Sequence, residues 1–276
     1  MKYTEVTIHI AQVDPFRDVV VYELGEGAYD SFVDTPDGVK AYVPTEQYDE
    51  AWLKAVLDDC GCECRFEAEQ MPDKNWNEEW EKGHKSVMVE GAKKVYVRAP
   101  FHPHLEADYE IVIEPKMSFG TAHHATTYMM LSYLSELPME GKRVLDMGCG
   151  TAVLAILAKM EGAAEVVGID VDEWAYRNAL ENAERNGVEI DCRLGDAMSL
   201  KECGMFDLVI ANINRNILLN DMDKYVLAMN GGATILFSGF YEADIPMLEA
   251  RGAELGLSLA EKRVREGWAA IRMIKK

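Results

Sequence analysis

The chain has 276 residues, of which 49% are hydrophobic, and this is enough for two domains that each bury a core. Its formal net charge of −20 disfavours direct binding to nucleic-acid phosphates, because the sequence holds no dense basic patch. The charge instead favours a cationic peptide or protein, or a positively charged cofactor, although solubility alone also explains an acidic composition.

The N-terminal stretch Met1–Ile10 alternates polar and apolar residues, unlike the apolar core of a signal peptide. No window approaches the ~18 apolar residues that a membrane-spanning helix needs. The six cysteines show no framework of paired spacings, and the cluster Cys60-Gly-Cys-Glu-Cys64 lacks the distant second pair typical of structural zinc sites. We therefore expect a cytoplasmic protein with reduced thiols, no membrane association and no bound metal.

Residues 1–70 predict a small α+β domain in which Thr45 caps the second helix and Thr35–Gly38 is a hairpin turn. The expected strands cover 2–12, 28–34, 39–43 and 62–68, and the expected helices begin at 14 and 45. This β-α-β-β-α-β order is the ferredoxin-like pattern. The domain has 16 acidic and five basic side chains, a net charge of −11, which favours recognition of a cationic protein over RNA.

Residues 71–84 are polar and carry Trp76 and Trp80 four positions apart, which places both indoles on one face of a helix. We interpret this segment as a linker helix that leads into a second domain at 85–276. Packing of the two Trp side chains against that second domain is equally compatible with the pattern.

The second domain alternates strands and helices, as expected for a parallel sheet with an antiparallel end. Strands are expected at 86–90, 94–98, 109–113, 142–147, 166–170, 189–194, 206–211, 233–238, 257–263 and 268–274, and helices at 124–137, 153–160, 173–186, 217–229 and 246–252. The segment 114–127 contains Gly120 and several Thr and His residues, so we expect it to be a ligand-binding loop.

The stretch 142–170 predicts the nucleoside-binding half of a doubly wound fold. A buried strand runs into Gly148 and Gly150, which can adopt backbone conformations closed to other residues and let a ligand approach the main chain. A helix follows at once, and its unpaired N–H groups and positive dipole end favour an anionic or polar ligand. A second strand then ends in the carboxylate of Asp170.

Two cofactors compete for this turn. The dinucleotide fingerprint G-x-G-x-x-G requires a third glycine where this chain has Val153. The stretch Val144-Leu-Asp-Met-Gly-Cys-Gly150 instead resembles the first motif of class I S-adenosylmethionine-dependent methyltransferases. In that family an acid precedes the glycines, here Asp146, and the acid that ends the second strand holds the ribose hydroxyls, here Asp170. Asp196 matches a position that often contacts adenine.

Further motifs narrow the resemblance. Asp207-Leu-Val-Ile-Ala-Asn-Ile213 matches the fourth-strand motif that lies beside the methyl group. With Phe119-Gly-Thr121 and Thr126-Thr127 ahead of the glycine turn, the whole chain resembles the PrmA family, whose members methylate large-subunit ribosomal protein eleven. The resemblance implies a class I methyltransferase domain, Rossmann-like with a seven-stranded, mostly parallel sheet, preceded by a small α+β ferredoxin-like domain for substrate recognition.

The resemblance also implies a set of residues that contact S-adenosylmethionine or line its pocket. These residues are Phe119, Thr127, Asp146, Gly148, Gly150, Asp170, Asp196 and Asn212. The usual ligand loop of the family reads F-G-T-G-T-H-P-T-T, and this chain has Ala122, His123 and Ala125 in place of Gly, Thr and Pro. The glycine motif ends in Thr151-Ala152 instead of Ser-Gly. These departures bear on the fine geometry of both loops.

Asn212 is the expected catalytic residue. Methyl transfer from a sulfonium is an in-line displacement, which needs alignment and a free lone pair on the acceptor. A lysine amine with a pKa of about 10.4 loses its proton near pH 7 at a cost of about 4–5 kcal/mol, and an α-amine at a much smaller cost. Burial beside the cationic sulfonium lowers the pKa of either amine further. The side-chain oxygen of Asn212 can accept a hydrogen bond from the amine and so turn its lone pair toward the methyl group.

Structural roles compete with these assignments. Asp146 can brace the turn instead of contacting the cofactor, and Asn212 can cap the following helix. Phe119 can pack without reaching the pocket. His123 and His124 are expected to start the helix or pack rather than to catalyse.

The sequence therefore predicts a monomeric protein N-methyltransferase that acts on lysine and N-terminal α-amino groups of a basic ribosomal protein, with S-adenosylmethionine as cofactor. One alternative is a class I methyltransferase for RNA or a small molecule. Another is a non-catalytic module that binds S-adenosylmethionine or NAD.

Overall fold

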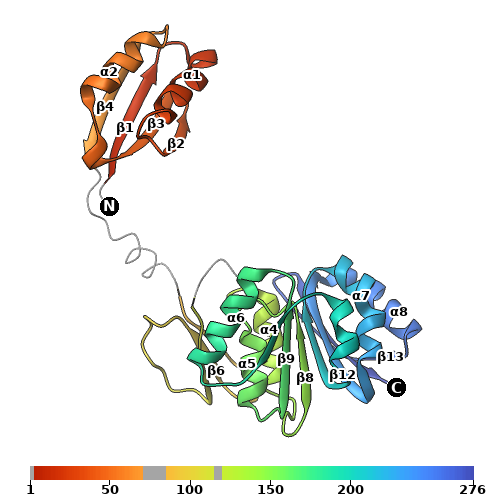
Figure 1. Ribbon diagram of the computed structural model, residues 1–276. Coiled ribbons are helices and arrows are strands. Elements are labelled where there is room, and N and C mark those ends of the chain that lie inside the picture. Colours follow the sequence, from red (N-terminus) through yellow and green to blue (C-terminus); the bar gives the residue numbers. More distant parts are fainter. Residues whose placement is uncertain (1–2, 71–84, 115–119) are drawn as a thin grey trace. The chain divides into compact units, whose positions relative to one another are not determined.

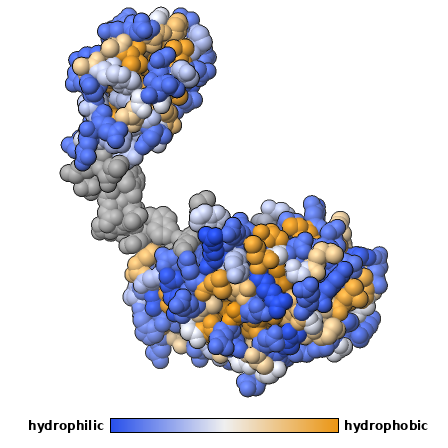
Figure 2. Space-filling view, viewed as in Figure 1, coloured by the Kyte–Doolittle hydropathy of each residue, from blue (hydrophilic) through white to orange (hydrophobic). Residues whose placement is uncertain are grey.

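The computed structural model describes residues 3–70, 85–114 and 120–276. The chain divides into two compact units, Met1–Gly83 and His84–Lys276 (Figure 1). The predicted linker helix at 71–84 and the predicted pocket residue Phe119 lie outside the described residues. Figure 2 shows hydrophilic side chains over much of the visible face of each unit, with apolar side chains gathered in patches on the second unit.

The N-terminal unit is a four-stranded antiparallel sheet, in the order β2-β3-β1-β4, packed against two helices. Its elements are β1 (Tyr3–Ile10), α1 (Val13–Gly25), β2 (Ser31–Thr35), β3 (Gly38–Pro44), the 3-10 helix η1 (Thr45–Gln47), α2 (Glu50–Asp59) and β4 (Cys64–Gln70). Ile8 of β1, Leu24 of α1 and Leu53 of α2 belong to one buried core. Both helices therefore pack against one face of the sheet, and the predicted ferredoxin-like arrangement is confirmed.

The second helix of this unit begins later than predicted. Thr45 lies in η1, where its hydroxyl pairs with that of Thr4 at 3.2 Å. The N-cap is Asp49, whose carboxylate accepts hydrogen bonds from the backbone N–H groups of Ala51 and Trp52 at 2.9 and 3.0 Å. The prediction of Thr45 as the cap was wrong, because a carboxylate on an extended residue next to the helix satisfies two of its free N–H groups.

The second unit is built on a seven-stranded sheet in the order β10-β9-β8-β11-β12-β14-β13. Its strands are β8 (Arg143–Met147), β9 (Glu165–Asp170), β10 (Asp191–Leu194), β11 (Phe206–Asn212), β12 (Met229–Tyr241), β13 (Leu257–Arg265) and β14 (Trp268–Lys275). The strands from β10 to β12 pair in parallel, whereas β14 is antiparallel to both β12 and β13. The predicted mostly parallel sheet with an antiparallel end is confirmed.

Helices cover both faces of this sheet (Figure 1). They are α4 (Ala125–Leu134), α5 (Val153–Met160), α6 (Glu173–Arg185), η2 (Ala197–Glu202), α7 (Arg215–Leu227), η3 (Glu242–Asp244) and α8 (Ile245–Glu254). Neighbouring residues of β8 enter different cores: Val144 packs with residues of α4 and α5, and Leu145 with residues of α7 and α8. Burial on both faces explains why these strands are continuously apolar. No helix in the described part of the chain is long and apolar enough to cross a membrane.

A small three-stranded sheet precedes α4 and is fastened to α6. It consists of β5 (Val87–Val89), β6 (Val95–Arg98) and β7 (Tyr109–Val112). The side-chain amide of Asn186 pairs with both backbone groups of Val112 at 2.8 Å, as a neighbouring strand would. The side-chain oxygen of Asn182 accepts a hydrogen bond from the N–H of Glu114 at 3.0 Å. These contacts hold the end of β7 against the C-terminal part of α6.

The strand order fixes where a ligand can bind. From β8 the chain moves outward to β9 and β10, and it then returns to β11 on the other side of β8. Loops at the carboxyl ends of β8 and β11 therefore leave the sheet in opposite directions and open a crevice between them.

Candidate active site

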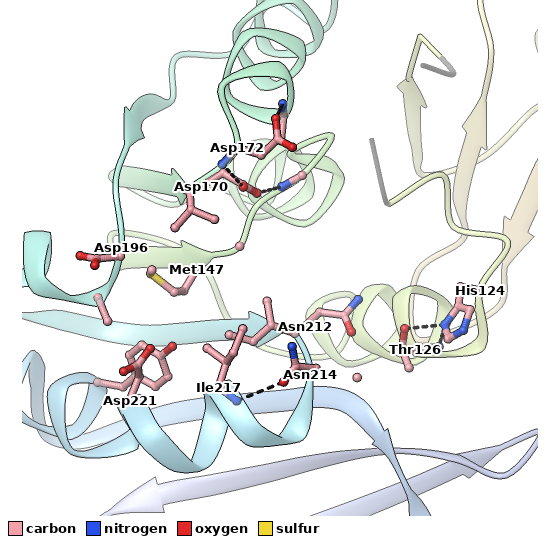
Figure 3. A pocket seen from close by; sticks show the side chains of 18 of the residues that line it. His124, Thr126, Met147, Asp170, Asp172, Asp196, Asn212, Asn214, Ile217 and Asp221 are labelled. Carbon is pink, nitrogen blue, oxygen red and sulfur yellow. Dashed lines mark hydrogen bonds between the residues drawn. The ribbon is translucent and has the colours of Figure 1, made fainter. Parts of the chain in front are cut away.

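A cavity of about 1060 Å³ lies at the carboxyl ends of β8, β9 and β11 (Figure 3). The predicted site residues that line it are Gly148, Gly150, Asp170, Asp196 and Asn212. The first turn of α6, the 3-10 helix η2, helix α7 and the neighbouring strands β12 and β14 complete its wall. The cavity thus occupies the crevice that the strand order predicts.

The glycine turn brings the main chain to the edge of this cavity. Gly148 and Gly150 have φ values of 72° and 54°, in the left-handed region that other residues rarely adopt. A Cβ atom on Gly148 would lie 2.3 Å from Cγ2 of Ile213, so a side chain does not fit there. The backbone conformation and the close approach of the β11 loop together require glycine at this position.

Two departures from the usual family pattern keep a backbone suited to glycine. Ala122 and Ala152 have φ values of 66° and 63°, and both side chains are almost completely buried. A left-handed conformation costs a non-glycine residue roughly 1–2 kcal/mol. The loops therefore keep their left-handed backbone, and the chain carries this local strain next to the site. Thr151 ties the two loops together, because its hydroxyl donates to the carbonyl oxygen of Gly120 at 2.8 Å.

The carboxylate of Asp170 is held in place by two backbone N–H groups. Its Oδ2 accepts from Gly150 at 2.8 Å and its Oδ1 from Asp172 at 3.0 Å. Each carboxylate oxygen has a second lone pair, and the residue lines the cavity. Asp170 can therefore accept hydrogen bonds from a pair of vicinal hydroxyls, such as those of a ribose, without rearranging.

Asp146 has a different environment. Its side chain is 1% exposed, and its carboxylate accepts a hydrogen bond from the N–H of Ala155 in α5 at 3.1 Å. Burial raises the pKa of the Asp146 carboxyl to about 7, and the nearby charge of Asp170 acts in the same direction. Asp146 is not among the described residues that line the cavity. Its contacts are those of a residue that braces the start of α5, the structural alternative considered from the sequence.

Asn212 combines one satisfied and one unsatisfied polar atom. Its Nδ2 donates to Oγ1 of Thr127 at 3.3 Å, and the residue lines the cavity. Its Oδ1 is buried and has no hydrogen-bond partner among the described residues. The N-cap of α7 is Asn214, which accepts from the N–H of Ile217 at 3.1 Å. The alternative that Asn212 caps this helix was therefore wrong.

Thr127 orients Asn212 but is itself 1% exposed and is not among the described residues that line the cavity. Its neighbour Thr126 and the helix N-cap His124 line the cavity instead. His123 contacts the carbonyl oxygen of Lys85 at 2.6 Å. Both histidines therefore have the helix-start and packing roles that the sequence predicts.

The cavity also contains residues that the sequence did not single out. Trp268, at the start of β14, contacts the ring of His124 with 4.6 Å between centroids and that of Tyr241 with 4.3 Å. Trp174, in the first turn of α6, is 77% exposed at the cavity wall. A bulky apolar residue at the start of a polar helix was a usable signal for Trp174. Trp268 reaches the site through the final hairpin, and its sequence context carries no such signal.

The cavity fits the expected cofactor S-adenosylmethionine. Asp170 can accept hydrogen bonds from the ribose hydroxyls. The glycine turn has no side chains at Gly148 and Gly150, so a bound molecule can contact the main chain there. Carboxylates predominate among the charged groups of the wall, which suits a molecule with a sulfonium and an ammonium group. These carboxylates are Asp170, Asp172, Asp196 and Asp221.

Comparisons with known proteins agree with this fold and with the expected family. A family model described as "Ribosomal protein L11 methyltransferase (PrmA)" matches residues 4–276. A ribosomal protein L11 methyltransferase of Porphyromonas gingivalis is 46% identical over 261 residues, which cover 92% of this chain and 89% of that protein. A protein of the same name from Bacteroides fragilis is 42% identical over 280 residues, covering 99% of this chain and 100% of that protein.

A solved structure has the same architecture. The crystal structure of a ribosomal protein L11 methylase from Lactobacillus delbrueckii subsp. bulgaricus matches with a TM-score of 0.62 and 25% identity, covering 70% of this chain and 100% of that one. Family match, relatives and fold point the same way, and S-adenosylmethionine is the cofactor of this family. The chain belongs to the ribosomal protein L11 methyltransferase (PrmA) family.

Proposed function

We propose that the chain is a protein N-methyltransferase that transfers methyl groups from S-adenosylmethionine to lysine side chains and to the N-terminal α-amino group of ribosomal protein L11. The observation that carries this proposal is the unpaired, buried Oδ1 of Asn212 at the cavity wall. A buried acceptor without a partner costs about 1–3 kcal/mol. An amine N–H of the substrate is a donor that removes this cost, and the names of the relatives supply ribosomal protein L11 as its source.

The residues of the site act mainly by alignment. When bound, S-adenosylmethionine supplies a methyl group on a sulfonium. The methyl carbon forms a bond to the substrate nitrogen, and the electron pair of the broken S–C bond stays on sulfur. Asp170 holds the ribose end of the cofactor, and its two backbone hydrogen bonds keep the carboxylate from turning away. Thr127 accepts from Nδ2 of Asn212, so Oδ1 is the atom left for the substrate amine. Fixed groups at both ends hold donor and acceptor in line.

The substrate amine must arrive without its extra proton. Asn212 accepts a hydrogen bond but is not a base, so the proton leaves to water before transfer. For lysine this costs about 4–5 kcal/mol near pH 7, and less once the amine is desolvated beside a cation. The remaining N–H points at Asn212, and the lone pair is then directed at the methyl group.

Aromatic side chains form one part of the cavity wall. His124 and Trp268 line it, and the ring of Tyr241 contacts that of Trp268 at a tilt of 30°. Aromatic faces suit the methylene stem of a lysine and attract its ammonium group, before and after methylation. We assign this wall to the incoming side chain of the substrate.

We assign recognition of the protein substrate to the N-terminal unit. Its net charge of −11 over residues 1–70 complements a basic ribosomal protein and disfavours RNA. In this proposal the enzyme acts as a monomer in the cytoplasm, where it meets its substrate, and residues 71–84 connect docking to catalysis.

The test is transfer of label from S-adenosylmethionine to ribosomal protein L11, followed by intact-mass analysis for added methyl groups. Asn212→Ala should lower the rate about 100-fold or more, an effect of the size seen when a positioned polar group of an active site is removed, with little change in S-adenosylhomocysteine binding. Asn216→Ala is the matched control, since Asn216 is exposed on the adjacent turn and does not line the cavity. Label that appears in ribosomal RNA and not in the protein would overturn the proposal.

A further inference from the structure

One face of helix α7 forms a wall of the cavity that the proposed mechanism does not use. Ile217, Asp221 and Tyr225 all line the cavity, at the four-residue spacing that places side chains on the same side of a helix. Exposure falls along this row, from 44% at Ile217 to 0% at Tyr225, so the row leads from the mouth to the floor. Figure 3 shows Ile217 and Asp221 extending from α7 into the cavity, with Asp196 on the opposite side.

The two deeper residues of this row have unused hydrogen-bonding capacity. The hydroxyl of Tyr225 is buried and has no partner among the described residues. Burial raises the pKa of Tyr225, so this hydroxyl stays neutral and can donate. The carboxylate of Asp221 accepts hydrogen bonds from Lys224 and Asn220, both at Oδ1, and its Oδ2 accepts none from the part of the chain that the structure describes. The floor of the cavity therefore offers one free donor and one free charged acceptor.

The position of this floor indicates which part of the cofactor it meets. Asp170 is the proposed partner of the ribose, and Asp196, the N-cap of η2, lines the side of the cavity expected to hold the base. Asp221 and Asp196 both line the cavity, and Figure 3 shows them at the same end of it, away from Thr126 and His124. Asp196 uses Oδ1 to accept from the N–H of Met198 at 2.9 Å, which leaves its Oδ2 available. Two carboxylates thus border the base end of the cavity.

The chemistry of this end is selective for one kind of purine. A 6-amino purine presents an N–H donor next to a ring nitrogen acceptor, which matches a carboxylate and a tyrosine hydroxyl. A 6-oxo purine presents a carbonyl oxygen next to a ring N–H, so its oxygen meets a carboxylate that cannot donate. We propose that Asp221 and Tyr225 are specificity-determining residues that select the 6-amino base of the cofactor. This inference rests on S-adenosylmethionine as the cofactor and is independent of the methyl acceptor.

The test compares binding of S-adenosylhomocysteine and S-inosylhomocysteine to the full chain by isothermal titration calorimetry. These probes differ only in the 6 substituent of the purine and in the proton on the neighbouring ring nitrogen. Both have an uncharged sulfur and the same amino-acid end, so general attraction to acidic groups cancels in the ratio of their affinities. The wild-type chain should bind the adenosyl compound at least about 10-fold more tightly, the size expected for a hydrogen bond to a charged group. Asp221→Asn offers an N–H to the 6-oxo group and should reduce this ratio by about 10-fold.

Asp223→Asn is the matched control, because Asp223 is on the same helix but is not among the described residues that line the cavity. Both affinities and their ratio should stay within about 2-fold of wild type, since a surface charge contributes little. Equal weakening of both ligands by Asp221→Asn, or no change in the ratio, would overturn the proposal. Neither result depends on whether the chain methylates ribosomal protein L11.

Tyr225→Phe adds a readout that a purely structural role does not produce. Removing a buried hydroxyl without a partner should leave the melting temperature of the free chain unchanged or higher. The same change should weaken S-adenosylhomocysteine binding about 3- to 10-fold, because the donor to the purine is lost. A lower melting temperature together with unchanged affinity would show that Tyr225 supports the fold and does not contact the base.

Discussion

Replacement of Asp170 by asparagine tests the cofactor site most directly. Asp170→Asn keeps the shape of the side chain but removes its charge and one of its two acceptor oxygens. Both oxygens are in use in the free chain, by Gly150 at 2.8 Å and Asp172 at 3.0 Å. The amide can serve only one of these N–H groups, so the variant should lose about 1–3 kcal/mol of unfolding free energy.

Asp170→Asn should also weaken cofactor binding, by a free energy similar in size to the loss of stability and separate from it. A hydrogen bond from a ribose hydroxyl to a charged acceptor contributes about 1.5–3 kcal/mol. Its loss corresponds to roughly 10- to 150-fold weaker binding of S-adenosylhomocysteine, measured by calorimetry. Asp191→Asn is the control, since Asp191 is exposed on the neighbouring strand β10 and pairs with Arg193. This variant should bind the cofactor product as tightly as wild type.

An analogue of S-adenosylhomocysteine without the two ribose hydroxyls completes the comparison. The wild-type chain should bind this analogue about as weakly as the Asp170→Asn variant binds the parent compound. The variant should lose little more affinity for the analogue, because the partner of the hydroxyls is already absent. Equal losses in wild type and variant would show that Asp170 does not contact the ribose and would refute the assignment.

Three further predictions follow from the same structure. Gly148→Ala should lower both the free energy of unfolding and the affinity for S-adenosylhomocysteine, because its Cβ would lie 2.3 Å from Ile213. Gly187→Ala is the control, since Gly187 has a similar φ of 66° and open space around it. This variant should show only the ~1–2 kcal/mol backbone cost in urea unfolding, with unchanged affinity. Burial raises the pKa of Asp146 to about 7, so the unfolded chain ionises first as pH rises, and the free energy of unfolding falls between about pH 4 and 7. Asp146→Asn cannot ionise, so its stability relative to wild type should rise by about 4 kcal/mol across that range. Parallel stability curves of variant and wild type would contradict this assignment. Removal of residues 1–70 should leave S-adenosylhomocysteine binding intact and abolish transfer to ribosomal protein L11, and full activity of the truncated chain would rule out a docking role.

Much of the fold was predictable because its signals are local. The alternation of β1 and the turn at 35–38 depend on near neighbours, and they gave the ferredoxin-like order. The left-handed backbone at Gly148 is likewise a property of the residue itself. Boundaries were less reliable: Asp49, and not Thr45, caps α2, since two nearby residues were each able to cap and the packed structure selected one.

The sequence by itself determined the class of this protein: a glycine turn followed by an acid at the end of the next strand specifies a nucleoside site through short-range geometry. Only the tertiary structure decided how the site is completed. It turned Asp146 toward α5, left Oδ1 of Asn212 unpaired, and brought Trp268 against His124. Such contacts join residues far apart in the chain, and they depend on strand order and packing, for which no pattern of neighbouring residues carries a signal.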